Sequence, residues 1–247
     1  MRKFSGAFFL ISCQDTKMDE DEHVYTFESY ENANGKDYHT HIDPALPPGQ
    51  IFVFDLDDVI TVEECDFIVN AIKTYKIRDL ESTLGKQSGL SNVKCHSISL
   101  DSIAIQNNIV SADIKKTLKK AFGKVKRKLG SLMDLRGVHD LNLREIYGPT
   151  KPHYDCPINK GDDRMLSVII ALNDDYKGGV IHFPEQQFSC KLRKLQMIAF
   201  PPFWTHPHFV TKPLDGTVRY TANTWLTFEA QGSPYEDLLQ NNTKTFL

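Results

Sequence analysis

Two histidine-bearing segments in the second half of the chain have the residue types of a metal site. His153 and Asp155 are two positions apart, and side chains at such positions of an extended segment share one face and can reach one ion. His206 and His208 follow some fifty positions later, in a single run. Two histidines and one carboxylate are the donors that a non-haem Fe(II) site uses when it keeps other coordination positions open.

Arg219 lies eleven residues after His208 and is the predicted partner of a carboxylate ligand. Its segment reads as a strand, in which Arg219, Thr221, Asn223 and Trp225 fall on one face. A guanidinium meets a carboxylate through two parallel hydrogen bonds, so Arg219 suits a carboxylic acid better than a metal. Metal donors together with a clamp for an acidic co-substrate indicate an oxygenase.

The composition is that of an ordinary globular protein of 247 residues, with 40% hydrophobic and 25% charged residues. A formal net charge of -3 argues against bulk nucleic-acid binding, and no segment has the length of a membrane-spanning helix. The five cysteines form no CxxC pair, which disfavours structural zinc and disulfides and favours the cytoplasm. The alternative is an exported lipoprotein, because the short apolar run before Cys13 resembles a signal segment.

The chain divides into a polar extension and one domain. Residues 1–49 are rich in turn-forming and acidic residues and predict an extension with little core of its own. Residues 50–247 are expected to form the single domain. It begins with a strand at 51–54 and a helix that a Thr61–Glu64 capping box opens and that ends near Tyr75.

The rest of the domain is predicted from turn residues and hydrophobic periodicity. Residues 78–100 are rich in glycine, serine and asparagine and predict a loop. An apolar stripe at steps of three and four predicts a helix from about 111 to 133, whose many lysines indicate a solvated face. From 138 to 228 the pattern becomes that of short strands separated by turns, which is typical of a sandwich or jelly roll. The fold class is therefore α+β, mainly β.

The order of the motifs resembles a known family. Residues 141–228 are similar to the catalytic core of the 2-oxoglutarate and Fe(II)-dependent oxygenases, in particular the prolyl 4-hydroxylase-like branch, and the resemblance extends to the helices from residue 50. The matching motifs are Tyr147-Gly148-Pro149, His153-Tyr154-Asp155, Leu172 to Gly179, Phe183-Pro184, Ala199-Phe200, His208-Phe209-Val210, Gly216 to Tyr220 and Trp225.

This resemblance implies a double-stranded β-helix (jelly roll) supported by N-terminal helices. It implies Fe(II) bound by His153, Asp155 and His208. It places the distal carboxylate of 2-oxoglutarate on Arg219, with a hydroxyl from Thr221 or Tyr147. The implied reaction uses O2 to hydroxylate an unactivated C–H, most readily in a prolyl or other peptidyl side chain, and releases succinate and CO2. The implied substrate is a peptide or a small molecule, and ascorbate is a further expected cofactor.

Two departures from the family pattern leave roles open. The loop between Tyr147 and His153 is shorter than usual, which weakens the transfer of a co-substrate role to Tyr147. Two histidines also compete for the third metal position. His208 fits the His-x-Val pattern of the family, whereas His206 fits a run found in some relatives. His208 is preferred, and the other histidine is then expected to be a pocket residue.

Two other interpretations of the chain deserve comparison. Asp55 and Asp57 follow an apolar run, as do the nucleophile and the acid/base of haloacid-dehalogenase-type phosphatases. The usual glycine is replaced by Asp58, however, and no alternation of strands and helices follows. A non-catalytic, cupin-like jelly roll built on His206 and His208 is the second alternative. Cupins place a glutamate a few residues after such a pair, where this chain has lysine and proline.

Overall fold

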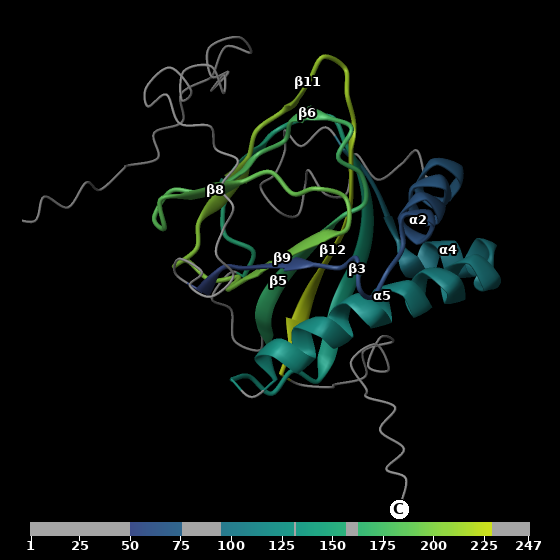
Figure 1. Cartoon of the computed structure of the whole chain (residues 1–247), viewed down its shortest axis with the longest axis horizontal. Coiled ribbons are helices and arrows are strands. Elements are labelled where there is room, and N and C mark those ends of the chain that lie inside the picture. The colour runs from purple at the N-terminus through teal and green to yellow at the C-terminus, as the bar shows by residue number, and fades with distance from the viewer. Residues whose placement is uncertain (1–49, 76–94, 131, 157–162, 229–247) are drawn as a thin grey trace, which may run out of the picture. The chain divides into compact units, whose positions relative to one another are not determined.

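The computed structural model describes residues 50–75, 95–130, 132–156 and 163–228 (Figure 1). The predicted extension at 1–49 lies outside these residues, so the division into an extension and one domain stays a prediction. Among the described helices none combines the length and the apolar character that a membrane span requires.

The described strands form two larger antiparallel sheets and a small ribbon. The main sheet has six strands in the order β1-β9-β5-β12-β3-β2, and the second has four in the order β4-β10-β7-β8. The main-sheet strands are β1 Phe52–Asp55, β2 Cys95–Ser99, β3 Gly137–Ile146, β5 Arg164–Ala171, β9 Gln196–Phe200 and β12 Arg219–Thr227. The others are β4 Thr150–His153, β7 Ile181–Phe183, β8 Phe188–Cys190, β10 His208–Val210 and the ribbon strands β6 Lys177–Gly178 and β11 Pro213–Leu214.

From β3 onward the chain crosses repeatedly between the two larger sheets. β3, β5, β9 and β12 belong to the main sheet, and β4, β7, β8 and β10, which come between them along the chain, belong to the second. This alternation is the topology of a double-stranded β-helix, so the predicted jelly roll and the mainly β fold class are confirmed.

Three helices cover the outer face of the main sheet (Figure 1). They are α2 Val62–Tyr75, α4 Leu100–Gln106 and α5 Asn108–Leu129. The predicted capping box of α2 is confirmed, because the Thr61 N–H donates to Glu64 Oε2 (2.9 Å) and the Glu64 N–H donates to Thr61 Oγ1 (3.2 Å). These bonds satisfy backbone donors that a helix start otherwise leaves free.

Each face of the main sheet carries its own apolar core. On the helix side, Ile68, Leu118 and Phe122 pack with Val168 and Ile170 of β5. The opposite, inner face packs on the second sheet through Ile169, Ile198, Ile181, Phe183 and Val210. Alternate residues of one strand thus enter different cores, as the period of two requires. The polar site described below lies on the inner face.

The prediction of a loop at 78–100 is wrong for residues 95–100. Residues 95–99 form β2, which pairs with β3, and Leu100 begins α4. Serine-rich composition favours a loop locally, but the pairing of every β2 residue with β3, from Cys95 opposite Ile146 to Ser99 opposite Asn142, outweighs that preference. Residues 78–94 lie outside the described part. Helix α5 begins earlier than predicted, because the Asn107 side chain accepts the Val110 N–H (3.2 Å) and caps it.

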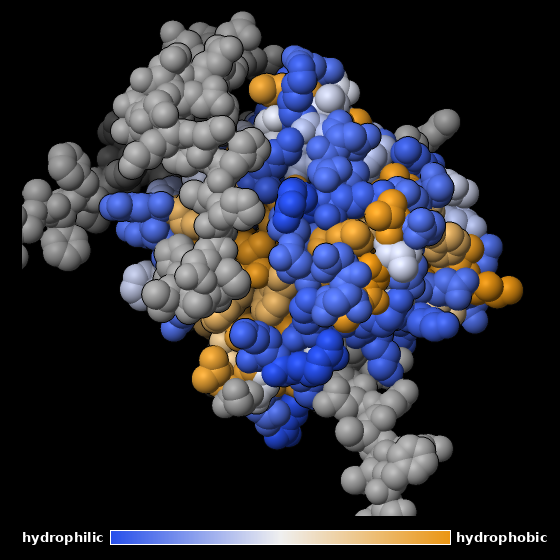
Figure 2. Space-filling model, viewed as in Figure 1, coloured by the Kyte–Doolittle hydropathy of each residue, from blue (hydrophilic) through white to orange (hydrophobic). Residues whose placement is uncertain are grey.

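The lysine-rich face of α5 is a solvated face, as predicted. The surface over this helix is mainly hydrophilic in Figure 2. Two of its lysines make ion pairs with acidic groups near the start of α2, Lys120 with Glu64 (2.5 Å) and Lys124 with Asp58 (2.5 Å). The charges therefore bind the helix to its neighbours and give no support to a nucleic-acid interface.

The geometry around Asp55 does not support the phosphatase interpretation. Strand β1 is an edge strand that pairs only with β9, in antiparallel sense, whereas that fold places its nucleophile in a parallel sheet. The Asp55 carboxylate accepts a hydrogen bond from Gln196 Nε2 (2.9 Å) and lies 3.6 Å from an Arg193 nitrogen. It is held by surface contacts rather than placed in a catalytic cluster.

Candidate metal centre and anion site

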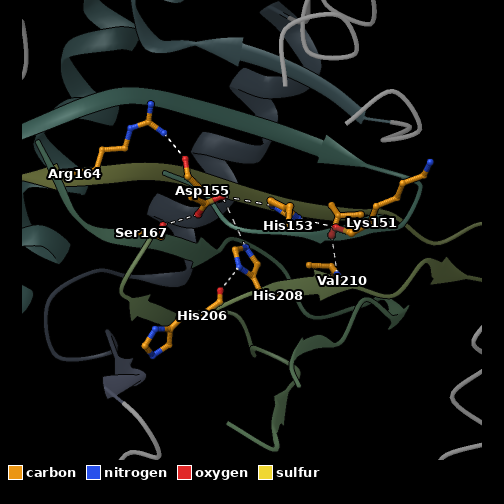
Figure 3. Close-up of polar contacts among 9 residues, drawn as sticks. Lys151, His153, Asp155, Arg164, Ser167, His206, His208 and Val210 are labelled. Atoms are coloured by element: carbon orange, nitrogen blue, oxygen red, sulfur yellow. Dashed lines mark hydrogen bonds and ion pairs between the residues drawn. The ribbon is translucent and has the colours of Figure 1, made fainter. Parts of the chain in front are cut away.

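The structure brings His153, Asp155 and His208 together. His153 ends β4, His208 begins β10, and the two are register partners; Asp155 lies in the bend after β4. Asp155 Oδ1 is 3.5 Å from His153 Nε2 and 3.9 Å from His208 Nε2. One ligand atom from each residue falls within 4.8 Å of the others, and no second group of this kind occurs in the described ranges (Figure 3). Two imidazoles and one carboxylate fit Fe(II).

Neighbouring groups hold each of these side chains in place. His153 Nδ1 lies 2.7 Å from the Lys151 carbonyl oxygen, and His208 Nδ1 lies 3.1 Å from the His206 carbonyl oxygen. Both rings are therefore set to donate from Nδ1 and keep Nε2 for a metal. Ser167 Oγ of β5 donates to Asp155 Oδ2 (2.5 Å), and this hydrogen bond fixes the orientation of the carboxylate. The triad is oriented before any ligand binds.

The electrostatics of the triad keep its carboxylate ionised. Burial alone would raise the pKa of Asp155, but the hydrogen bond with His153 and the nearby charge of His208 hold that pKa well below its usual range. Burial lowers the pKa of His208. Burial also acts to lower the pKa of His153, but the hydrogen bond and charge of Asp155 raise it overall. An anionic oxygen beside a neutral His208 is the state that binds a divalent metal.

The competition between the two histidines has a geometric answer. Both side chains are buried, His206 at 5% and His208 at 3% exposure. The His208 ring faces Asp155, whereas the His206 ring points away from it (Figure 3). His206 Nδ1 lies 2.9 Å from Thr205 Oγ1. His206 thus contributes its backbone carbonyl to the orientation of His208 and stands outside the triad.

Arg219 is a buried cation at the start of β12. Its residue is 3% exposed, and its Nε and Nη2 atoms have no hydrogen-bond partner. Tyr176 lies beside it: burial raises the pKa of the Tyr176 hydroxyl, and the charge of Arg219 opposes that rise. Gly179 is also close, since a Cβ there would lie 3.3 Å from Arg219 Cδ. A buried guanidinium with unused donors is the expected state of an anion-binding residue before its ligand arrives.

Of the two predicted hydroxyl groups, only Thr221 lies on the face of Arg219. Thr221 is fully buried and donates to Asn223 Oδ1 (2.5 Å). Tyr147 turns the other way, because Ile146 is the register partner of Arg219 and the next residue alternates. Burial raises the pKa of Tyr147, and a hydrogen bond to Glu145, which lies on that opposite face, raises it further. The geometry therefore does not support a co-substrate role for Tyr147.

Three polar residues of the site were not found from the sequence. Ser167 bonds Asp155, and a guanidinium nitrogen of Arg164 donates to the Asp155 carbonyl oxygen (2.5 Å) while the group stacks 4.6 Å above the Trp225 ring. Arg144 is the register partner of Thr221 and so lies on the inner face. The alternation of β3 places Asn142, Arg144 and Ile146 together and could have shown that the strand carries a cation inward.

Comparisons with known proteins agree with this site. Residues 144–227 match the sequence model of the 2OG-Fe(II) oxygenase superfamily. A viral collagen prolyl hydroxylase from Paramecium Bursaria Chlorella virus-1, solved with 2OG, is 16% identical, covers 72% of this chain and 95% of its own, and has a TM-score of 0.52. A prolyl hydroxylase from Trichoplax adhaerens, solved with a peptide fragment of a hypoxia inducible factor, is 14% identical, covers 78% and 88%, and has a TM-score of 0.56.

At such identities the two solved structures establish the fold, and the superfamily model confirms the resemblance that the motifs predicted. No curated protein matches the chain in sequence. The cupin-like alternative gains nothing from the geometry, because no glutamate joins the cluster that the described residues form.

Proposed function

We propose, from the premise that residues 144–227 carry a 2-oxoglutarate- and Fe(II)-dependent oxygenase domain, that this protein hydroxylates an unactivated C–H of a peptide. In this proposal His153, Asp155 and His208 bind the metal, and Arg219 binds the distal carboxylate of the co-substrate. The observation that carries the proposal is the buried guanidinium of Arg219, whose Nε and Nη2 have no hydrogen-bond partner, on the sheet face that also supports the metal triad.

The placement of Arg219 argues for a carboxylate rather than for a structural role. A buried cation without a counter-charge is costly, so it is retained where a ligand supplies the charge. Ser167, which holds Asp155, is the register partner of Trp225 on β5 and β12. Arg219, Thr221 and Trp225 alternate along β12, so the arginine and the metal triad border one interior space. A dicarboxylate whose keto end reaches the metal therefore has a cation for its far end.

The residues of the chain have separable tasks in this reaction. When bound, Fe(II) and 2-oxoglutarate supply the O2-dependent oxidation that places a hydroxyl on carbon and releases succinate and CO2. His153, Asp155 and His208 would hold Fe(II) with three donors and leave it able to bind co-substrate and O2. Ser167 and the backbone carbonyls of Lys151 and His206 keep the donors aligned. The apolar inner core below them excludes water from that side.

A prolyl or other peptidyl side chain is the proposed substrate. The solved Trichoplax prolyl hydroxylase holds a peptide fragment, and its fold covers 78% of this chain. Two exposed aromatic side chains stand close in sequence to the metal ligands: Tyr154 between His153 and Asp155, and Trp204 just before His206. Exposed aromatic rings of this kind pack well on extended peptide. Cys65 and Cys190 are buried free thiols, which supports a reducing location such as the cytoplasm.

The proposal is tested by anaerobic titration of the Fe(II)-loaded protein with 2-oxoglutarate, followed through the visible charge-transfer band that direct contact between them produces. We expect a saturable band. Arg219→Gln should bind Fe(II) as before but need at least about tenfold more 2-oxoglutarate, since a charge-assisted fork is lost. Arg136→Gln, which removes an exposed arginine paired with Asp134, is the matched control and should change nothing. Bound iron without a band would overturn the proposal.

The substrate class is tested separately, by succinate release from 2-oxoglutarate in the presence of candidate substrates. Peptides that contain proline should stimulate release above the uncoupled rate, and mass spectrometry should show a gain of one oxygen in the peptide. The same assay with and without ascorbate tests the expected further cofactor. Stimulation by free amino acids alone would contradict the peptidyl assignment and leave the oxygenase assignment intact.

A further inference from the structure

Arg144 is a second arginine on the inner face of the main sheet, one strand away from Arg219. Arg144 lies opposite Thr221, and Arg219 lies opposite Ile146, in the register of β3 and β12. Direct partners share a face, and diagonal partners lie roughly 7–8 Å apart. The two arginines are therefore diagonal neighbours on one face, and they flank Thr221, which is fully buried.

Arg144 is also close to the metal triad. Strand β3 leads directly into β4, which ends in His153 and belongs to the opposing sheet. Arg144 lies opposite Thr221, two residues beyond Arg219 along β12 in the direction of Trp225, and the β5 partner of Trp225 is Ser167, which holds Asp155. In register, Arg144 is therefore nearer than Arg219 to the end of the interior space where the metal ligands lie.

No group in the described part of the chain neutralises Arg144. Its Nε is buried without a hydrogen-bond partner. The adjacent acid on its own strand, Glu145, belongs to the opposite face, where it accepts a hydrogen bond from the Tyr220 hydroxyl (3.2 Å). Arg144 is half-buried, unlike the fully buried Arg219, but its unpartnered Nε is a donor that an anionic ligand can use.

The co-substrate of the proposed reaction is itself an anion with two carboxylates. With Arg219 at its distal carboxylate, the keto end and its own carboxylate lie toward the metal triad, which is the direction in which Arg144 follows Arg219 in the register. A five-carbon dicarboxylate can therefore place one carboxylate at each arginine. A single ligand then contacts both the buried Arg219 and the half-buried Arg144, which accounts for two arginines on the inner face.

We propose that Arg144 is a second co-substrate-binding residue, which holds the carboxylate next to the keto group of 2-oxoglutarate while Arg219 holds the distal one. This inference rests on the proposed function. It adds a residue that the sequence motifs do not mark, and it assigns each arginine to one end of the ligand.

The test compares two ligands that differ only at the distal end. 2-Oxopentanoate has a methyl group where 2-oxoglutarate has its distal carboxylate. Both are titrated into anaerobic, Fe(II)-saturated protein by the charge-transfer band, and into Zn(II)-loaded protein by calorimetry, so that no readout depends on turnover. Arg144→Gln should weaken both ligands by a similar factor of at least about ten, because each keeps the proximal carboxylate. Arg219→Gln should weaken 2-oxoglutarate alone.

Two further variants make the result decisive. Lys177→Gln removes an exposed charge on β6 that pairs with Asp215 and should leave both affinities unchanged, which separates a specific contact from a general effect of net charge. Arg144→Lys keeps the charge without the fork, so it should bind both ligands more tightly than Arg144→Gln and more weakly than the wild type. If the glutamine variant does not fold, the lysine variant alone carries the test.

Three outcomes would overturn the inference. Unchanged affinity of Arg144→Gln, or of Arg144→Lys where it stands alone, for both ligands would leave Arg144 without a co-substrate contact. A lower affinity of the Arg144 variant for 2-oxoglutarate but not for 2-oxopentanoate would place Arg144 at the distal carboxylate. Absence of any 2-oxoglutarate binding by the wild type would remove the proposed function as well, which distinguishes that failure from the other two.

Discussion

At the scale of single residues, the two buried histidines of the run 205–208 differ in the direction of their rings. His208 Nε2 lies 3.9 Å from Asp155 Oδ1, while His206 contributes its carbonyl oxygen to the His208 ring. His208→Ala should therefore abolish tight Fe(II) binding, because it removes one of three donors. His206→Ala keeps the carbonyl and should retain most of the affinity. Competition with a fluorescent metal chelator measures both, and the reverse ranking would make His206 the ligand.

Ser167 gives a second prediction at this scale, since it holds Asp155 without touching the metal in our assignment. Its hydroxyl is buried and donates to Asp155 Oδ2. Ser167→Ala should weaken Fe(II) binding by about 10–100-fold, the usual cost of losing a group that orients a ligand. Ser189→Ala removes a hydroxyl that bonds His182 instead and serves as the control in the same chelator assay. Equal affinities for the two variants would show that the carboxylate needs no such support.

At the scale of elements, the turn between β6 and β7 lies against the side chain of Arg219. Gly178 and Gly179 have φ values of 65° and 66°, a left-handed conformation that residues with a Cβ rarely adopt. A Cβ on Gly179 would lie 2.7 Å from Tyr176 Cε2 and 3.3 Å from Arg219 Cδ. Tyr176 is itself buried, so neither neighbour can move freely. The conformation of this turn is therefore linked to the position of the anion site.

Gly179→Ala should then lower both stability and co-substrate affinity. We expect a loss of about 1–2 kcal/mol from the backbone conformation, with a further cost from the displaced side chains. Gly216→Ala is the matched control: its φ is 70°, but nothing lies within 4 Å of an added Cβ. Thermal unfolding and 2-oxoglutarate titration of both variants separate the two effects. Equal losses of 2-oxoglutarate affinity in the Gly179→Ala and Gly216→Ala variants would mean that the contact with Arg219 does not affect co-substrate binding.

Elements with strong local signals could be predicted from the sequence, and those formed by pairing could not. The apolar run of β5, the alternation of β12 and the capping box at Thr61 are local signals, and the structure agrees with them. Strand β2 has serines at alternate positions, and β4 contains Pro152 and Lys151. Both form because a neighbouring strand offers a register, β3 for β2 and β10 for β4.

The candidate site divides in the same way. The order of the motifs was enough to name His153, Asp155, His208 and Arg219 as candidates. The structure places His153 and His208 on the second sheet, Asp155 in the bend after β4, and Arg219 on the main sheet. The sheet face on which Tyr147 lies and the inward position of Arg144 both depend on cross-strand register. A single sequence does not reveal that register where the loop between Tyr147 and His153 differs in length from the family pattern.

At the scale of the whole described domain, one sheet carries two cores, and a buried thiol reports on each. Cys65 lies in the core under the helices, and Cys190 lies in the core between the sheets. Burial raises the pKa of Cys65 to about 11 and that of Cys190 to about 12. Only the thiolate reacts with alkylating agents. At pH 8 both thiols should therefore react only in molecules that have transiently opened and exposed them to solvent.

Ligand binding then tests whether the two cores open together. The strands of the main sheet contribute alternate residues to both cores, so one layer cannot separate without disturbing the other. Fe(II) with 2-oxoglutarate at a hundred times its dissociation constant should stabilise the protein by about 2.7 kcal/mol and slow alkylation of both cysteines about 100-fold. Mass spectrometry of iodoacetamide-treated protein follows each site separately, and reaction in denaturant gives the unprotected rate. Protection of Cys190 without protection of Cys65 would show that the inner layer, with its anion site, opens independently of the helices.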